Sequence, residues 1–402
     1  MTGCPEVPVG DSLTTTLGVP TGSSRCAGRL TMTSAKASDQ TYRVAVIGAG
    51  RPRSQTGATG FGMSHAHAKG YTATGRCRLV AVADVVADNA TAFAHVHGDA
   101  ETVTFTDYHE MLASARPEVV SICTWPHLHA EMVIASAQAG VRAIHCEKPM
   151  APTWGEARRM AKACATSGTQ LTFNHQRRFE APYRTARSLV RAGAIGDLVQ
   201  VELACSNLFD WGTHWFDMLF FYVGETPASW VIAQTDTQTL TSAFAVDMEN
   251  QGIALVGFES GVRGFMTTGD TVPDGAPRAD NPQPRREALG AMQRLVGTAG
   301  VIEVGVRGTY NAKVRILNGD APGWQEPPLA GADHFEDAIG AGVADLIACL
   351  DNGHEPELSV HKAIRGTELI FASYESSRTH SRITLPLTGV EGNPLHEIIA
   401  SR

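Results

Sequence analysis

The nine residues His145–Thr153, HCEKPMAPT, follow the apolar run Val141–Ile144, which predicts a buried strand. Charged residues at the carboxyl end of such a strand lie where an open α/β sheet binds its ligands. Pro149 cannot continue the hydrogen-bonded ladder and favours an extended backbone at Lys148. We therefore expect Lys148 at the edge of a pocket, as a candidate acid/base group.

Short apolar runs alternate with segments of helical spacing on both sides of this stretch. Such alternation is typical of βαβ units and predicts a parallel sheet. The expected strands are residues 43–47, 79–83, 119–123, 141–145 and 170–173, and the expected helices are residues 85–97, 127–139 and 153–167. We place a first domain at residues 41–166.

Longer β-like runs follow, and they predict an antiparallel or mixed sheet with one covered face. The expected strands are residues 197–206, 229–235, 251–258, 262–268, 301–306 and 382–387, and the expected helices are residues 213–223, 333–351 and 360–377. Residues 270–287, rich in Pro, Asp, Gly and Arg, predict a surface loop. We place a second domain at residues 167–402.

Length and composition narrow the class of protein. A chain of 402 residues exceeds one ordinary core, which predicts two domains. A net charge of −8 without a basic tract argues against a nucleic-acid partner, and no apolar run of about 18 residues predicts a membrane span. Eight cysteines without a Cys-x-x-Cys pair favour a reducing compartment, and hence the cytoplasm, over a disulfide framework.

The first 40 residues are rich in Thr, Ser and Gly, show no periodicity and lack the apolar segment of a secretory signal. We expect residues 1–40 to form a disordered arm. The alternative is a start assigned too far upstream, with Met32 as the first residue of the native chain.

Gly48 and Gly50 follow the first expected strand and begin a dinucleotide fingerprint, in which glycine lets backbone N–H groups approach a pyrophosphate. The usual third glycine is replaced by Arg53. We expect Gly60 or Gly62, after an expanded loop, to take its place. A purely structural turn is the alternative explanation of the first two glycines.

Asp84 ends the second expected strand, where a carboxylate can accept hydrogen bonds from the adenosine ribose hydroxyls. The same carboxylate would repel a 2′-phosphate, so NAD is favoured over NADP. A helix N-cap is the alternative role of an aspartate here.

Several features occur in the order of one known family. They are Gly48-x-Gly50, Asp84, Thr124-Trp125-Pro126 with His129, Glu147-Lys148-Pro149, and Arg178-Phe179. Over residues 42–387 the chain resembles the family named for glucose–fructose oxidoreductase, inositol dehydrogenase and MocA, and the Glu-Lys-Pro motif is the specific part. The resemblance implies an α/β Rossmann domain at residues 41–166 and an α+β domain at residues 167–402, built on a large, mostly antiparallel open sheet for substrate binding and oligomerisation.

The resemblance also implies a cofactor, a reaction and partners. Members bind NAD or NADP, oxidise or reduce a carbinol of a sugar, cyclitol or related polyol, and often form homodimers or homotetramers through the exposed face of the large sheet. The cofactor-binding residues that it implies are Gly48, Gly50, Gly60, Phe61, Gly62, Asp84, Thr124, Trp125, Pro126, His129, Glu147 and Lys148. Packing explains Trp125 equally well, because this residue departs from the common pattern.

Asp210 and His214 are four residues apart and share one face at a helix start. With Lys148 they map onto the catalytic trio of sugar- and inositol-oxidising relatives. Histidine, with an unperturbed pKa of about 6.5, is suited to take up the hydroxyl proton as hydride leaves, and Asp210 would orient it. Lys148 would relay the proton or stay charged and hold the oxygen. Without the resemblance, a helix cap and a core histidine are the simpler explanations.

Polar residues after the strand expected at 170–173 predict a substrate loop. We expect Asn174 and His175 to contact substrate hydroxyls, together with the catalytic trio. Arg178 is a further substrate candidate, although one of the adjacent arginines is expected to link the domains. Asp217 is expected to hydrogen-bond His214 or the substrate.

Fifteen histidines raise the question of a metal. The closely spaced pairs are His65 and His67, His95 and His97, and His127 and His129. Residues two apart diverge on a helix, and no His-Glu-x-x-His or Gly-x-Ser-x-Gly motif is present. We therefore expect neither a catalytic metal nor acyl transfer.

The sequence thus predicts an NAD-dependent dehydrogenase of a sugar, cyclitol, polyol or glycoside. Two other classes stay open: an NAD-dependent glycoside-cleaving enzyme that oxidises its sugar transiently, and a non-catalytic sensor that binds the nucleotide. Net NADH formation would argue against the first. The complete set of Lys148, Asp210 and His214 argues against the second.

Overall fold

The computed structural model describes residues 41–52, 54–56, 62–269, 292–305, 313–329, 331–332 and 334–401. The arm expected at 1–40, the loop expected at 270–287 and the cofactor candidates Gly60 and Phe61 lie outside these residues, so those expectations stay predictions. No helix within the described ranges has the length and apolarity needed to cross a membrane.

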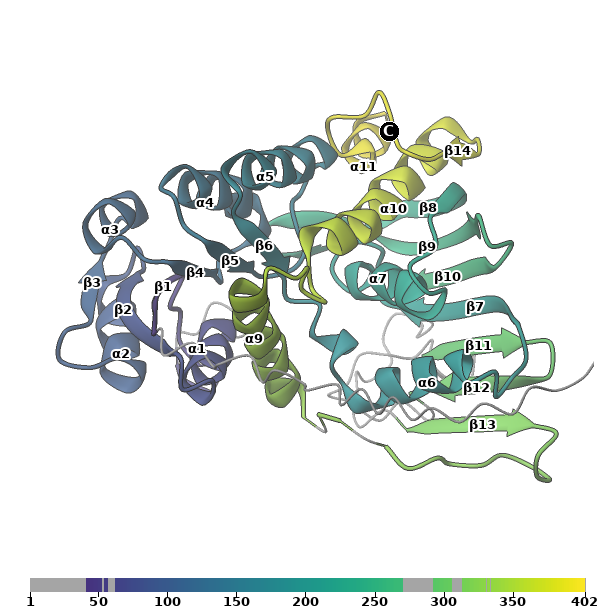
Figure 1. The fold of residues 1–402 in the computed structure, drawn as a ribbon. Helices are drawn as coiled ribbons and strands as arrows, with labels where there is room; N and C mark the ends of the chain where they lie inside the picture. The colour runs from purple at the N-terminus through teal and green to yellow at the C-terminus, as the bar shows by residue number, and fades with distance from the viewer. Residues whose placement is uncertain are drawn as a thin grey trace, which may run out of the picture. The chain divides into compact units, whose positions relative to one another are not determined.

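Six parallel strands form the first sheet, in the order β3-β2-β1-β4-β5-β6 (Figure 1). The strands are β1 (Tyr42–Ile47), β2 (Cys77–Ala83), β3 (Val103–Phe105), β4 (Val119–Ile122), β5 (Ala143–Cys146) and β6 (Gln170–Phe173). β4 and β5 are buried along their whole length, as expected of a parallel sheet covered on both faces. The strand order reverses between β1 and β4, which is where open α/β sheets bind ligands.

Helices from both halves of the chain cover this sheet. They are α1 (Met63–Ala73), α2 (Ala87–His97), α3 (Tyr108–Ala115), α4 (Pro126–Gln138), α5 (Trp154–Ser167) and α9 (Phe335–Asn352). α4 and α5 lie together, whereas α1 packs against α9 (Figure 1). Gly70 of α1 permits this packing, because a Cβ there would lie 3.1 Å from the Cα of Gly340. Val343, Leu346 and Ile347 of α9 then join the apolar core with residues of β1, β4 and β5.

Eight strands form the second sheet, in the order β13-β12-β11-β7-β10-β9-β8-β14. They are β7 (Leu198–Cys205), β8 (Ala228–Ala243), β9 (Val246–Phe258), β10 (Arg263–Gly269), β11 (Gln293–Gly297), β12 (Gly300–Val304), β13 (Val314–Asn318) and β14 (Ile383–Thr384). β7 and β10 are parallel, and the other neighbouring pairs are antiparallel. The fold class expected from the sequence is confirmed.

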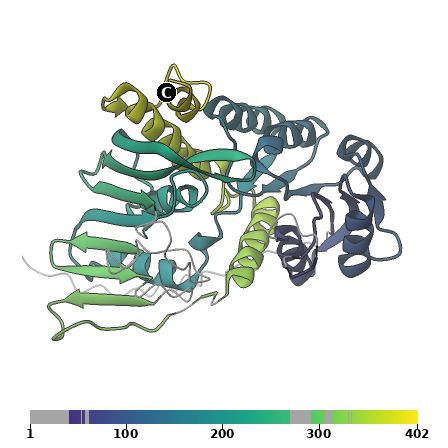
Figure 2. The same cartoon turned by 180° about the vertical axis from the view of Figure 1, so that it is seen from behind.

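One face of the second sheet is covered by α6 (Ala181–Arg191), α7 (Gly212–Tyr222) and α10 (Val360–Thr379); η1 (Gln176–Arg178) and α11 (Pro394–Ala400) are the remaining helices (Figure 1). Every residue of α7 is buried, since this helix packs against both β7 and α10. The other face has no described helix over it (Figure 2). Along β8, Ile232, Gln234 and Asp236 are accordingly exposed, while the residues between them are buried.

Several elements differ from the sequence expectation. β6 pairs with β5 in the first sheet, although it lies beyond residue 166, where we expected the first domain to end. The short strands β3, β11 and β13 and the helices α3 and α6 were not predicted. These strands have three, five and five residues, which is too few for a clear alternation of apolar and polar positions. The bounds of the two domains stay predictions.

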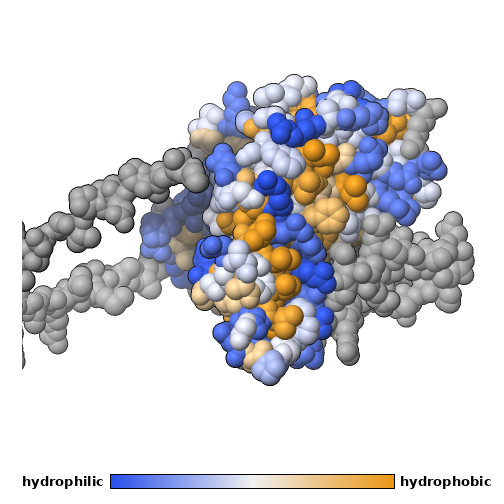
Figure 3. Space-filling model, turned by 90° about the vertical axis from the view of Figure 1, so that its right-hand side faces the viewer, coloured by the Kyte–Doolittle hydropathy of each residue, from blue (hydrophilic) through white to orange (hydrophobic). Residues whose placement is uncertain are grey.

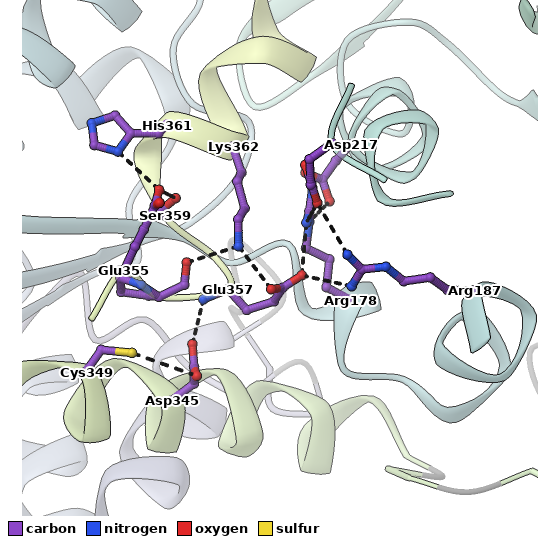
Figure 4. A network of polar contacts seen from close by, with 12 residues as sticks. Arg178, Arg187, Asp217, Asp345, Cys349, Glu355, Glu357, Ser359, His361 and Lys362 are labelled. Carbon is purple, nitrogen blue, oxygen red and sulfur yellow. Dashed lines mark hydrogen bonds and ion pairs between the residues drawn. The ribbon is translucent and has the colours of Figure 1, made fainter. Parts of the chain in front are cut away.

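Arg178 is the fully buried centre of an ion-pair network (Figure 4). Its guanidinium donates to both carboxylate oxygens of Asp217, at 2.7 and 2.9 Å, and to Glu225 and Glu357 at 2.6 and 3.0 Å. Lys362 donates to Glu357 at 3.0 Å. Burial alone would lower the pKa of Arg178, but Asp217 and Glu225 raise it. The network therefore joins η1 to α7 and to the start of α10.

We expect Arg178→Met to lower the free energy of unfolding by about 3–5 kcal/mol, because it leaves the buried carboxylate of Asp217 without its cation. Lys69→Met is the control, since it breaks an exposed pair with Glu336 and should cost less than about 1 kcal/mol. Urea unfolding followed by tryptophan fluorescence measures both. Equal losses in the two variants would show that the buried network has no special weight.

Candidate functional site

A cavity of about 520 Å³ lies at the carboxyl ends of β1, β4 and β5. Both halves of the chain contribute to its lining. The predicted site residues that line it are Gly48, Gly50, Gly62, Asp84, Thr124, Trp125, Pro126, Glu147, Lys148, Asn174, Asp210 and His214. Most of the residues selected from the sequence therefore meet in one place.

The glycine turn after β1 forms one part of this cavity. Gly48 and Gly50 have positive φ angles of 85° and 58°, and Gly62, which precedes α1, has a φ of 65°. A Cβ on Gly48 would lie 2.8 Å from Cγ2 of Thr124 and 3.0 Å from the carbonyl carbon of Cys123. Glycine thus allows the ends of β1 and β4 to approach closely. The turn and the first N–H groups of α1 fit the pyrophosphate of a dinucleotide.

Asp84 lines the same part of the cavity. Its carboxylate accepts hydrogen bonds from the N–H groups of Gly50 and Val86, both at 2.9 Å. Asp84 therefore holds the glycine turn and the chain entering α2, but it is not the N-cap of that helix, because Val86 occupies that position and no side chain caps it. Its exposure to the cavity leaves the ribose contact as a prediction.

The Glu-Lys-Pro stretch lies directly after β5, and Glu147 and Lys148 both line the cavity. The Glu147 carboxylate accepts hydrogen bonds from Nε2 of His67 at 2.9 Å and from Nδ2 of Asn174 at 2.7 Å. Nζ of Lys148 donates to Oδ1 of Asp210 at 2.7 Å. The side chains of Lys148 and Asp210 keep 21% and 16% of their surface exposed, so the pair can meet a ligand in the cavity.

The loop before α7 determines where Asp210 points. Oδ1 of Asn207 accepts the N–H of Asp210 at 2.6 Å, and the buried Glu249 accepts the N–H of Leu208 at 2.6 Å. The carboxylate of Asp210 then meets Lys148. Oδ1 of Asp210 thus engages Lys148, and the expectation that Asp210 orients the imidazole stays a prediction.

His214 lines the cavity at 4% exposure, and its Nδ1 has no hydrogen-bond partner among the described residues. Its ring packs edge-on against that of His175, with 5.5 Å between centroids. Burial, followed by the charges of Lys148 and Arg177, lowers the pKa of His214 well below its usual value. The imidazole is therefore neutral near pH 7 and keeps a ring nitrogen lone pair that can accept a hydrogen bond. His175 is 2% exposed and lies behind His214, outside the cavity lining.

Arg178 and Asp217 do not line the cavity. They pair with each other, so the expected contact of Arg178 with substrate is replaced by a structural role, and the expected contact of Asp217 with His214 is replaced by this ion pair. Arg178 is thus the structural arginine of the adjacent pair, and it links η1 to α7.

His129, predicted to bind the cofactor, is fully buried and outside the cavity lining. Its Nδ1 lies 3.0 Å from the carbonyl oxygen of Pro149, and its Nε2 lies 3.0 Å from that of Thr124. The ring therefore joins the Glu-Lys-Pro turn to the end of β4. The predicted contact of His129 with the cofactor stays a prediction, because its ring does not face the cavity.

Trp125 is 39% exposed and lines the cavity, which favours a pocket role over packing. Sequence reasoning missed the neighbouring aromatic residues Trp211, Phe244 and Phe335. Phe244 occupies the turn between β8 and β9 with a φ of 54°. This hairpin turn lacks the Asn or Gly that usually marks one, so the sequence carried no local signal for it.

The residues that the structure describes contain no group of three or more His, Cys, Asp or Glu side chains arranged to hold a metal ion. Nδ1 of His65 and Nε2 of His97 lie 2.8 Å apart, and burial lowers the pKa of both imidazoles. This pair lies outside the cavity lining.

Comparisons with known proteins agree with this geometry. Residues 42–175 match the profile of an oxidoreductase family with an NAD-binding Rossmann fold. The chain is 25% identical to an inositol 2-dehydrogenase of Rhizobium meliloti over 86% of its own length and 99% of the relative, and 28% identical to a D-apiose dehydrogenase of Paraburkholderia graminis over 81% and 87%. The solved structure of a levoglucosan dehydrogenase with NADH and levoglucosan shares the fold, with a TM-score of 0.69 at 20% identity over 87% of this chain and all of that one.

We expect Gly48→Ala to weaken dinucleotide binding at least about tenfold, because the new methyl group collides with Thr124 and the backbone at Cys123. Gly140→Ala is the matched control. Gly140 has a similar φ of 81° but open space around its Cβ position, so it carries the backbone strain without the collision. Isothermal titration calorimetry with NAD⁺ compares the two variants. Equal weakening would contradict the role of the close approach at Gly48.

Proposed function

We propose that this chain, a member of the oxidoreductase family with an NAD-binding Rossmann fold, is an NAD-dependent dehydrogenase that oxidises a carbinol of a sugar, cyclitol, polyol or glycoside. One observation carries the proposal. Lys148, Asp210 and His214 line the same cavity as the glycine turn at Gly48 and Gly50. Groups able to bind a dinucleotide and groups able to move a hydroxyl proton are therefore contiguous.

The reacting groups have complementary roles in this proposal. The ammonium of Lys148, held by Asp210, donates a hydrogen bond to the carbinol oxygen. The neutral imidazole of His214 accepts the hydroxyl proton, either directly or by way of another group that is hydrogen-bonded to the carbinol oxygen. The bound nicotinamide supplies the hydride acceptor. Because Asp210 neutralises Lys148, the site carries no excess charge that would oppose loss of hydride from the carbinol carbon.

NAD is preferred over NADP in this proposal because of Asp84. Its carboxylate lines the cavity next to the glycine turn and already accepts two N–H hydrogen bonds. A 2′-phosphate would meet this charge, whereas ribose hydroxyls would donate to it. Nearby Arg51 is engaged with Asn89, at 2.9 Å.

The proposed substrate class is supported by the relatives, which are named for inositol, D-apiose and D-glucosides. These substrates share neutral, hydroxyl-rich rings. The polar residues Asn174 and Gln176 and the aromatic residues Trp125 and Trp211 line the cavity and suit such rings. The described cysteines are all free, which supports a reducing compartment such as the cytoplasm.

We propose that two or more copies associate through the uncovered face of the eight-stranded sheet. Ile232 pairs with Leu255, and Leu255 pairs with Phe265, so an apolar row crosses three strands. Ile232 and the neighbouring Ile253 are 46% and 50% exposed. Figure 3 shows the side of the molecule on which this sheet lies in Figure 1. Apolar side chains gather there in a band among polar ones. Exposed apolar patches of this kind mark interaction surfaces.

We expect Lys148→Ala to lower kcat by about 100-fold or more while NAD⁺ affinity changes little, because the variant loses the proton-handling cation and keeps the glycine turn. The assay is NAD⁺ reduction on the best substrate from a screen of inositols, monosaccharides and simple glycosides. Lys69→Ala, at an exposed position, is the control and should keep normal turnover. Near-normal turnover of the Lys148 variant would refute the assignment.

We expect Ile253→Lys to convert the dimer or tetramer to a smaller species, because it places a charge on the same face, next to the apolar row. Val96→Lys is the matched control, since Val96 is 66% exposed on α2 and far from this row in sequence. Light scattering after size-exclusion chromatography measures the mass of each variant. A monomeric parent protein, or an unchanged mass in the Ile253 variant, would reject this interface.

A further inference from the structure

A second charged cluster lies beneath the wall of the cavity, next to Lys148. His67 of α1 is fully buried; its Nε2 contacts Oε1 of Glu147 at 2.9 Å and its Nδ1 contacts the hydroxyl of Ser121 at 2.7 Å. Asn174 donates to the same Glu147 oxygen at 2.7 Å. The other Glu147 oxygen accepts the backbone N–H of Lys148 at 3.2 Å. α1 and the ends of β4, β5 and β6 thus meet around one carboxylate.

Glu147 needs His67 to stay charged. It is 6% exposed, and an isolated carboxylate at such a depth takes up a proton instead. The ammonium of Lys148 is committed to Asp210, and Asn174 is uncharged. Burial alone would raise the pKa of Glu147, but His67 lowers it most, followed by Asn174 and the charge of Lys148. Burial likewise opposes the charge on His67, but Cys123 and Glu147 raise its pKa to about 10.

The hydroxyl of Ser121 completes the arrangement, because it can accept a hydrogen bond from the protonated ring. Both nitrogens of His67 are then satisfied while the ring is cationic. The pair presents its negative end to the cavity, since Glu147 is part of the lining and His67 is not.

We propose that His67 is a positioning residue that keeps Glu147 ionised at the cavity wall, and that this fixed negative charge favours NAD⁺ over NADH. This inference rests on the proposed function, which places the nicotinamide at the end of the cavity lined by Lys148 and His214. The nicotinamide ring is cationic in NAD⁺ and neutral in NADH. A carboxylate in a cavity of low dielectric constant attracts the first and not the second.

The test is the ratio of the dissociation constants for NAD⁺ and NADH, Kd(NAD⁺)/Kd(NADH), measured by calorimetry without a substrate. We expect His67→Gln to raise this ratio about tenfold at neutral pH, because Glu147 then becomes protonated and loses its charge. Glu147→Gln should raise the ratio by a similar factor. The double variant should show no further rise, because both changes remove the same charge.

His145→Gln is the matched control. His145 is also fully buried, and its ring centroid lies 4.6 Å from that of His67, but it bonds Thr172 and does not line the cavity. Its replacement should leave the ratio unchanged. Thermal unfolding of each variant separates loss of fold from loss of charge.

The ratio of the His67 variant should also depend on pH. As pH rises, Glu147 of that variant loses its proton and the preference for NAD⁺ returns, whereas the parent protein keeps its ratio between about pH 6 and 8. Other titratable groups also face this cluster. Those facing Glu147 are Lys148, His129, His175 and Cys146, and those facing His67 are Cys123 and His145.

An unchanged ratio in Glu147→Gln would overturn the inference even if the His67 variant fails to fold. An equal rise in His145→Gln would overturn it too, because it would assign the effect to lost packing. If the parent protein binds neither form of the cofactor, the proposed function itself fails. Normal binding with an unchanged ratio in both cluster variants rejects the inference about His67 and Glu147 and leaves the proposed function standing.

Discussion

The burial of Arg178 among carboxylates is the interaction on which the geometry of the cavity depends. Asp217 lies three residues after His214 in α7, and Arg178 lies three residues after His175. Their two hydrogen bonds therefore hold the helix that presents His214 against the loop that follows β6. Separating these segments would leave buried charges unpaired, at a cost of several kcal/mol. The loop that follows β6 and the helix α7 are held together by this requirement.

Two charged residues directly after β5 are also paired with an opposite charge. Lys148 pairs with Asp210 from the loop before α7, and Glu147 pairs with His67 from the helix that begins after the glycine turn. Two neighbouring residues thus connect the end of β5 to the loop that carries Asp210 and to the helix that follows the glycine turn. This one segment therefore links the part of the cavity at the glycine turn to the part lined by Lys148 and Asp210.

Much of this could be predicted from the sequence, because the relevant signals are local. Alternation of apolar runs predicted the parallel sheet, and the charged Lys148 after such a run predicted the edge of a pocket. Pairing partners were not predictable in the same way. Asp210 and His214 share a helical spacing, yet Asn207 turns the Asp210 backbone so that its carboxylate meets Lys148. The contact of α9 with α1 depends on two glycines separated by 270 residues, which no local pattern connects.

The balance of charge around Lys148, Glu147 and His214 affects which charge on a substrate the cavity would attract. Lys148 is compensated by Asp210, Glu147 is compensated by His67, and His214 is neutral. Arg177 lies over the rings of Trp211 and Trp215 and pairs with Glu180. A site whose charges are compensated in this way exerts little net attraction on an anionic substrate, and it discriminates by the directions of its hydrogen bonds. That is the recognition required for a neutral polyol ring, whose hydroxyl groups differ in direction and not in charge.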